Sequence, residues 1–145
     1  MDYGNALLCN TSGKNINRLQ KLQNSCARLI TFTPRTEHIT PTLQQLHWLP
    51  IDKRLQFKIL VHTYRCLNGS APSYMKDMLK PYTPDQRLRS SNQEYLEIPK
   101  STTSSSTRSF NFAAPTLWNK LPLEMRKANT IKAFKKQLKT HLFSQ

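Results

Sequence analysis

Residues 52–69, DKRLQFKILVHTYRCLNG, decide the fold, because they form the best core helix that the sequence predicts. Apolar residues recur every three or four positions in this stretch, which places them on one face of a helix. The predicted inward face consists of Leu55, Ile59, Leu60, Tyr64 and Leu67. Asp52 is a candidate N-cap, and Gly69 follows the last apolar position as a C-terminal stop.

Two further helices are predicted on the N-terminal side. A helix from about Lys14 to Ile30 is amphipathic, so its apolar residues are expected to face inward and its basic residues outward. The expected inward residues are Ile16, Leu19, Leu22, Cys26, Leu29 and Ile30, and the expected outward residues are Lys14, Arg18, Lys21 and Arg28. Thr40 as N-cap, with Pro41 at the first helical position, predicts a short helix that stops before Pro50.

The next part of the chain is richer in prolines, serines and threonines. Another short helix is predicted to begin at residues 70–72 and to end before Pro81. Residues 82–108 predict a loop, and the Ser/Thr-rich stretch 101–107 is expected to be its most mobile part because nothing there can be buried in a core. Residues 95–98 can form one short strand, and residues 110–112 can either pair with it or begin the next helix.

Helical patterns resume in the C-terminal part. Residues 110–118 are rich in large apolar groups, Pro122 interrupts them, and Thr130 caps a final helix. The apolar stripe of that helix is Ile131, Phe134, Leu138 and Leu142. The sequence therefore predicts a mainly α fold of several short amphipathic helices around a small core, with a Ser/Thr-rich loop and at most one short β pairing. The expected segments of this one unit are residues 1–33, 34–81, 82–109 and 110–145.

The charge of the chain indicates its partners. Twenty-two Lys and Arg residues face eight acidic residues, for a net charge of +14 over 145 residues. Such an excess favours polyanions, with RNA or DNA the first expectation. From Lys100 to the end, nine Lys or Arg residues accompany only Glu124, so the charge is concentrated in the last third. No run approaches the roughly 18 apolar residues of a membrane span, so no membrane partner is expected.

The candidate phosphate contacts follow from this distribution. The main set is Arg126, Lys127, Lys132, Lys135, Lys136 and Lys139, and a second set on the N-terminal helix is Lys14, Arg18, Lys21 and Arg28. The alternative for either set is an ordinary solvated surface. Trp48 and Trp118 can stack on bases, but both lie among leucines and prolines, which favours packing in the core.

Metal sites and cofactors are not expected. The cysteines Cys9, Cys26 and Cys66 are odd in number and widely spaced, which favours reduced thiols in the cytoplasm or the nucleus over disulfides or zinc ligation. His47 and His62 lack partners at metal-ligand spacing and are interpreted as helix-face residues. No glycine-rich phosphate loop and no Gly-x-Ser-x-Gly motif is present, so neither catalytic residues nor a small-molecule substrate are expected.

Several short motifs occur together in one order along the chain. They are HITP (38–41), LHWLP (46–50), LNG (67–69), AP (71–72), YTP (82–84), LRSS (88–91), AAP (113–115), LWN (117–119), LP (121–122) and HLF (141–143). In this order they resemble the region that follows the polymerase domain in the reverse transcriptase of LINE-type, non-LTR, jockey-like retrotransposons. Residues 19–30 are similar to a helix of the polymerase thumb in the same family.

The resemblance implies a role without catalysis. The chain has no Asp-Asp dipeptide, whereas two-metal nucleotidyl transfer needs clustered carboxylates. The implied function is that of a C-terminal fragment of a retrotransposon RNA-directed DNA polymerase, which binds RNA or DNA phosphates in support of reverse transcription and integration. The alternatives are a structural module that docks on the thumb of the element's polymerase domain and a decayed element fragment without a selected function.

Overall fold

The computed structural model describes residues 11–83, 93–101, 103 and 106–144. These residues are mainly helical, which confirms the predicted fold class. The described elements are α1 (Gly13–Thr31), α2 (Ile39–Gln45), α3 (Ile51–Leu67), α4 (Ser73–Lys76), the 3-10 helix η2 (Ser106–Arg108), α5 (Phe110–Trp118), α6 (Leu123–Arg126) and α7 (Ile131–Phe143). Residues 102, 104 and 105 of the Ser/Thr-rich stretch lie outside the described residues, so the mobility of that stretch stays a prediction.

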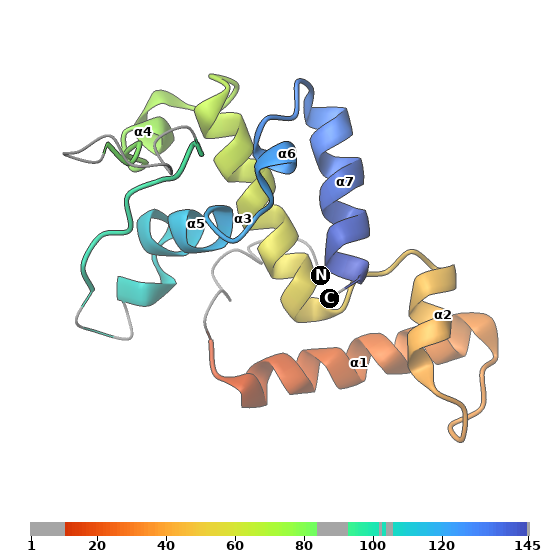
Figure 1. Cartoon of the computed structure of the whole chain (residues 1–145). Coiled ribbons are helices and arrows are strands. Elements are labelled where there is room, and N and C mark those ends of the chain that lie inside the picture. Colours follow the sequence, from red (N-terminus) through yellow and green to blue (C-terminus); the bar gives the residue numbers. More distant parts are fainter. Residues whose placement is uncertain (1–10, 84–92, 102, 104–105, 145) are drawn as a thin grey trace.

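Helix α3 occupies the centre of the arrangement (Figure 1). It packs against α5 and α7, and its N-terminal end also contacts α1. Helix α3 ends as the sequence predicts, because Gly69 adopts a left-handed φ of 68° and the amide of Ser70 donates to the Arg65 carbonyl at 2.9 Å. Of the predicted inward residues of α3, Leu67 alone is wrong: it lies in the last turn, past the edge of the core, and is 38% exposed.

The starts of two helices and the length of a third differ from the sequence prediction. Helix α2 is capped by His38, whose ring accepts a hydrogen bond from the amide of Thr40 at 3.4 Å, so Thr40 lies inside the first turn. Helix α3 begins after Pro50, which places Asp52 in its first turn without a capping bond. Helix α4 starts after Pro72 and has one turn only. For α2 and α3 a neighbouring residue with extended backbone, rather than the predicted cap, precedes the helix, whereas α4 follows Pro72 of the predicted start and ends earlier than expected, at Lys76.

The core is built around aromatic residues of α3, α5 and α7. The Tyr64 and Phe134 rings stack with centroids 4.5 Å apart, and Trp118 lies 5.9 Å from the same Phe134 ring. The Tyr64 hydroxyl donates to the Ala128 carbonyl at 2.6 Å, and the indole of Trp118 donates to the Glu94 carbonyl at 3.0 Å. Each polar tip therefore has an acceptor while the ring is buried. Trp118 is a core residue, as the sequence favours.

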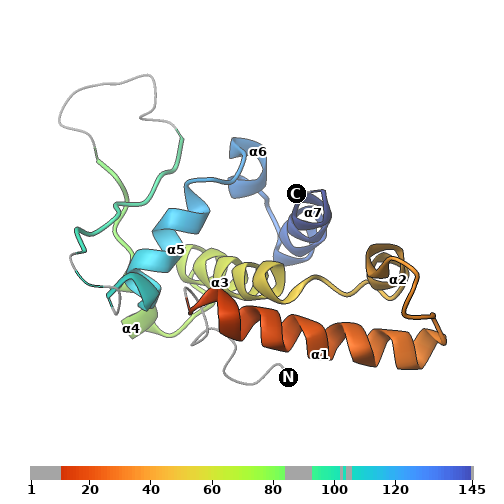
Figure 2. The same ribbon diagram turned by 90° about the horizontal axis from the view of Figure 1, so that it is seen from below.

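The inward face predicted for α1 is wrong in large part. The helix has the expected length, but Leu22, Leu29 and Ile30 are exposed, with Leu29 at 76%. The buried residues of α1 are Gln23 and Ala27, which face α2 and the start of α3. Figure 2 shows α1 running beneath α3 with α2 at its C-terminal end.

Two glutamines join α1 to the beginning of α3. The side-chain oxygen of Gln20 accepts from the amide of Ile51 at 2.8 Å, and the side-chain nitrogen of Gln23 donates to the Leu49 carbonyl at 2.9 Å. The first amides of a helix have no partner within the helix, and Pro50 offers no side-chain acceptor. Gln20 therefore caps α3 from another helix, a role that the sequence pattern does not predict.

The predicted short strand takes a different partner from the one considered in the sequence. Leu96 forms an isolated antiparallel bridge with Pro81, with the amide of Tyr82 donating to the Tyr95 carbonyl at 2.9 Å. Phe110 begins α5, so of the two alternatives for residues 110–112 the helix is correct and the strand pairing is wrong.

Candidate nucleic-acid interface

The last helix, α7, presents lysines along one flank. Thr130 caps it as predicted, since its hydroxyl accepts from the amide of Ala133 at 3.2 Å. The predicted stripe packs inward, with Phe134, Leu138 and Leu142 buried. The basic residues beside this stripe, called here the α7 lysine flank, are Lys132, Lys135, Lys136 and Lys139.

The geometry of the helix brings these four lysines together. At about 100° per residue they fall within about 100° of one another around the helix axis. Lys132 and Lys136 are exposed, whereas Lys135 and Lys139 are half-buried beside the apolar stripe. Such lysines can lay their aliphatic stems on the core and keep the ammonium group in water. Because α7 contains no acidic residue, no carboxylate of the same helix offsets this charge.

A hollow of about 170 Å³ adjoins the α7 lysine flank, and part of its lining comes from the segment that connects α2 to α3. Lys139 of α7 and Arg54 of α3 line it, together with the half-buried ring of Trp48. The backbone directs this ring, because His47 adopts a left-handed φ of 54° and the Trp48 amide donates to the Leu43 carbonyl at 2.8 Å. Trp48 is therefore not a fully buried core residue, and an aromatic surface lies beside two cations.

Arg126 does not belong to this surface, which corrects its prediction as an exposed phosphate contact. It is 6% exposed, and its guanidinium carbon lies 4.3 Å from the centre of the Tyr95 ring. The neighbouring Lys127, at the end of α6, is exposed as expected. The sequence pattern could not predict that Arg126 is buried and Lys127 exposed, because the Tyr95 ring that covers Arg126 comes from a distant segment of the chain.

The basic residues of α1 form a separate set. Lys14, Arg18 and Lys21 are exposed, as predicted. Arg28 is half-buried and donates to the carbonyls of Pro34 and Glu37, the latter at 2.7 Å, so it closes the loop after α1. Helix α1 packs against α2 and α3, whereas α7 packs against α3 and α6. The two predicted basic sets therefore lie on different elements.

Two titratable groups outside the flank have shifted pKa values. Burial, followed by the positive charges of Arg65 and Lys58, lowers the pKa of His62 from 6.5. Burial raises the pKa of the Cys66 thiol. Within the described residues, no three His, Cys, Asp or Glu side chains gather where they could hold a metal ion. No helix in the described part of the chain is long and apolar enough to cross a membrane.

Comparison of the chain with protein-family models, with curated proteins and with solved structures finds no match in any of the three. The sequence could locate the α7 lysine flank, because charge and periodicity coincide there. It could not locate the hollow beside Trp48, since Arg54 and Lys139 are far apart along the chain.

Proposed function

We propose that this chain binds the phosphates of RNA or DNA through the α7 lysine flank, as a non-catalytic C-terminal fragment of a retrotransposon reverse transcriptase. One observation carries the proposal: four lysines share one flank of a helix, directly beside the apolar stripe that is buried in the core. In this role the chain holds the element's RNA or its target DNA close to the polymerase domain during reverse transcription and integration.

The physical argument is electrostatic. Lys132 and Lys139 are separated by about 10 Å along the axis at ~1.5 Å per residue, which spans about three nucleotide steps of a B-form strand at ~3.4 Å each. Lysine contacts to phosphates release condensed counterions and carry little sequence information. The aromatic ring of Trp48 beside Lys139 and Arg54 adds a surface on which an unpaired base can stack.

A second candidate function is docking on the polymerase domain, and the exposed apolar face of α1 favours it. Leu22, Leu29, Ile30 and Phe32 are all exposed, with Phe32 at 90%. An apolar face of this kind fits a packed contact with another domain. In this reading the lysines keep the protein soluble and contact no phosphate.

The salt dependence of binding distinguishes the two functions. The full chain should bind a single-stranded oligonucleotide with little sequence preference and a slope of about −3 in log affinity against log salt, from ~0.7 per phosphate contact and about four contacts. The double variant Lys132→Gln with Lys136→Gln should flatten that slope by about 1.4 and leave the fold intact.

A matched control removes the same charge elsewhere. Lys76→Gln with Lys80→Gln also deletes two exposed lysines, but from the region of α4. The control should retain most of the slope. Equal losses in both variants would reduce the binding to diffuse net charge and would favour the docking function.

A further inference from the structure

Arg126 is a buried cation with unused hydrogen-bond donors. It is more than nine-tenths buried, and its Nε and Nη1 atoms donate to no acceptor among the described residues. A guanidinium always carries its charge and has five N–H donors. Buried charges are normally paired, so an unpaired one indicates a missing partner. The contact with the Tyr95 ring offsets part of the burial cost but satisfies no donor.

The buried arginine lines a cavity of about 320 Å³. The cavity lies between the end of α3, the bridged segment at Leu96 and the Arg126 side chain of α6. Its walls are fixed by the core, because the indole of Trp118 donates to the Glu94 carbonyl. Glu94 is among the residues that line the same cavity and is the only acidic residue of its described lining. The walls of the cavity are therefore held by the core, whereas the Nε and Nη1 atoms of Arg126 are covered, so the guanidinium must turn toward the cavity to donate to a ligand.

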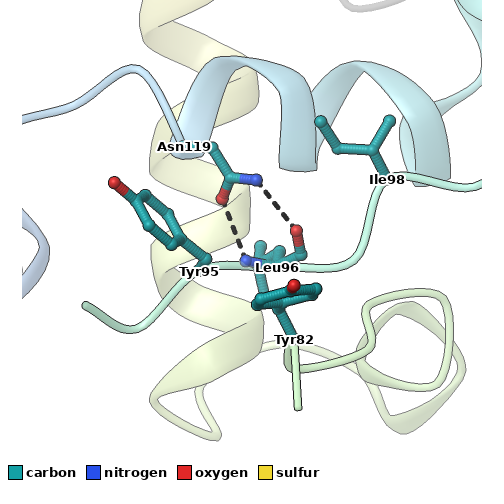
Figure 3. A pocket seen from close by; sticks show the side chains of 5 residues that line it. All are labelled: Tyr82, Tyr95, Leu96, Ile98 and Asn119. Atoms are coloured by element: carbon teal, nitrogen blue, oxygen red, sulfur yellow. Dashed lines mark hydrogen bonds between the residues drawn. The ribbon is translucent and has the colours of Figure 1, made fainter. Parts of the chain in front are cut away.

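A second hollow, of about 420 Å³, adjoins the first across Tyr95 and Leu96. Figure 3 shows its lining, with Tyr82, Tyr95 and Ile98 around Leu96 and Asn119. The Asn119 side chain accepts from the Leu96 amide at 2.9 Å and donates to the Leu96 carbonyl at 2.8 Å. Since α5 thereby holds the segment that carries Tyr95, the aromatic walls are positioned in advance. Tyr82 and Ile98 remain exposed although they are large and apolar.

We propose that these two hollows form one site for an unpaired nucleotide, with a phosphate bound by Arg126 and the base held between the tyrosines and Ile98. The inference rests on the proposed function for its ligand class. A nucleotide matches both halves, because it joins an anion that accepts several hydrogen bonds to a flat ring that stacks on aromatic side chains. The net charge of +14 favours a phosphate-bearing ligand over an aromatic carboxylate.

The test measures binding of thymidine 5′-monophosphate to the full chain by NMR, next to thymidine and to inorganic phosphate. The nucleotide should bind at least about tenfold more tightly than either half, because only it occupies both hollows. Arg126→Met should weaken nucleotide binding by about tenfold to a hundredfold, the range expected for the loss of a charge-assisted hydrogen bond. The same variant should keep or raise the melting temperature, since an apolar side chain removes an unpaired buried charge.

Two further variants guard against misfolding as the cause of any loss. Arg126→Lys keeps the charge but lacks the planar fork, so its affinity should fall between that of the natural chain and Arg126→Met. Glu94→Gln should bind the nucleotide more tightly, because it removes the only acidic residue of the described lining. Arg126→Met should keep the salt slope that the four α7 lysines give the single-stranded oligonucleotide, so failure of this site is distinguishable from failure of the proposed function.

Three results would overturn the assignment. Unchanged nucleotide affinity in Arg126→Met would show that Arg126 binds no phosphate. Equal affinities for inorganic phosphate and for the nucleotide would show that the aromatic hollow is not used. Tighter binding of N-acetylphenylalanine than of the nucleotide would assign the site to a protein carboxylate instead.

Discussion

Helix α7 buries its apolar stripe, whereas α1 exposes most of its own. Phe134 of α7 is fully buried against Tyr64 and Trp118, but Leu29 of α1 is 76% exposed. The difference arises from what each helix meets. Helix α7 lies along α3 in the aromatic core, while the main contacts of α1 among the described elements are with α2 and α3. An amphipathic pattern therefore shows that a face is apolar, and the available partner surface decides whether that face is buried.

The largest expected effect is on the free energy of unfolding, which should depend on the apolar stripe of α7 far more than on that of α1. Phe134→Ala should lower the free energy of unfolding by about 3–5 kcal/mol, because it leaves a cavity among packed rings. Leu29→Ala should change it by less than about 0.5 kcal/mol, since the side chain is largely in water already. Urea unfolding followed by circular dichroism measures both. A loss for Leu29→Ala close to that for Phe134→Ala would mean that α1 is buried in solution.

A smaller loss of unfolding free energy is expected at the contact between α1 and the segment that precedes α3. Gln23→Ala should destabilise the chain by about 1–3 kcal/mol, because the Leu49 carbonyl would lose its buried donor. The neighbouring exposed position offers the control: Leu22→Ala should cost far less. Thermal melts of the two variants give the comparison. Equal and small losses would show that the glutamine contact does not hold α1 in place.

The smallest expected effect concerns α3, the helix against which both α1 and α7 pack. The folded-state pKa of His62 is lowered by burial, Arg65 and Lys58, so the unfolded chain binds the proton more readily. This contribution to stability is fully present above pH 6.5 and is lost as the pH falls toward the lower folded-state pKa. Unfolding free energies measured over this range should fall less steeply in His62→Gln. If the unfolding free energies of the natural chain and of His62→Gln fell in parallel with pH, His62 would not be the group that causes the pH dependence.

Sequence reasoning succeeded where the cause of a structure is local. The stop at Gly69, the cap at Thr130 and the stripe of α7 each depend on residues within a turn or two of one another. It failed where the cause is remote. Gln20 reaches an amide of α3, and Arg126 is covered by Tyr95 of another segment. The burial of a polar residue depends on a partner far along the chain, which periodicity cannot identify.

The candidate nucleic-acid interface also has a part that the sequence predicted and a part that it could not predict. The α7 lysine flank was predictable, because the lysines follow one another at helical spacing and no acid interrupts them. The sequence could not predict that Arg28 and Arg126 are withdrawn from the exposed surface. Arg28 closes a loop, and Arg126 is buried in the core. Basic residues counted together in the sequence thus serve three different purposes in the structure.

The most direct test of the central claim is an NMR titration of the full chain with a thymidine strand of about 12 nucleotides, within the site sizes of single-strand binders. The ammonium and methylene signals of Lys132, Lys135, Lys136 and Lys139 should shift first as the strand is added at low salt. The signals of Lys14 and Lys21 on α1 should move far less, and all shifts should shrink as salt is raised. Shifts of equal size on α1 and α7, or no shifts on α7 at saturation, would contradict the account.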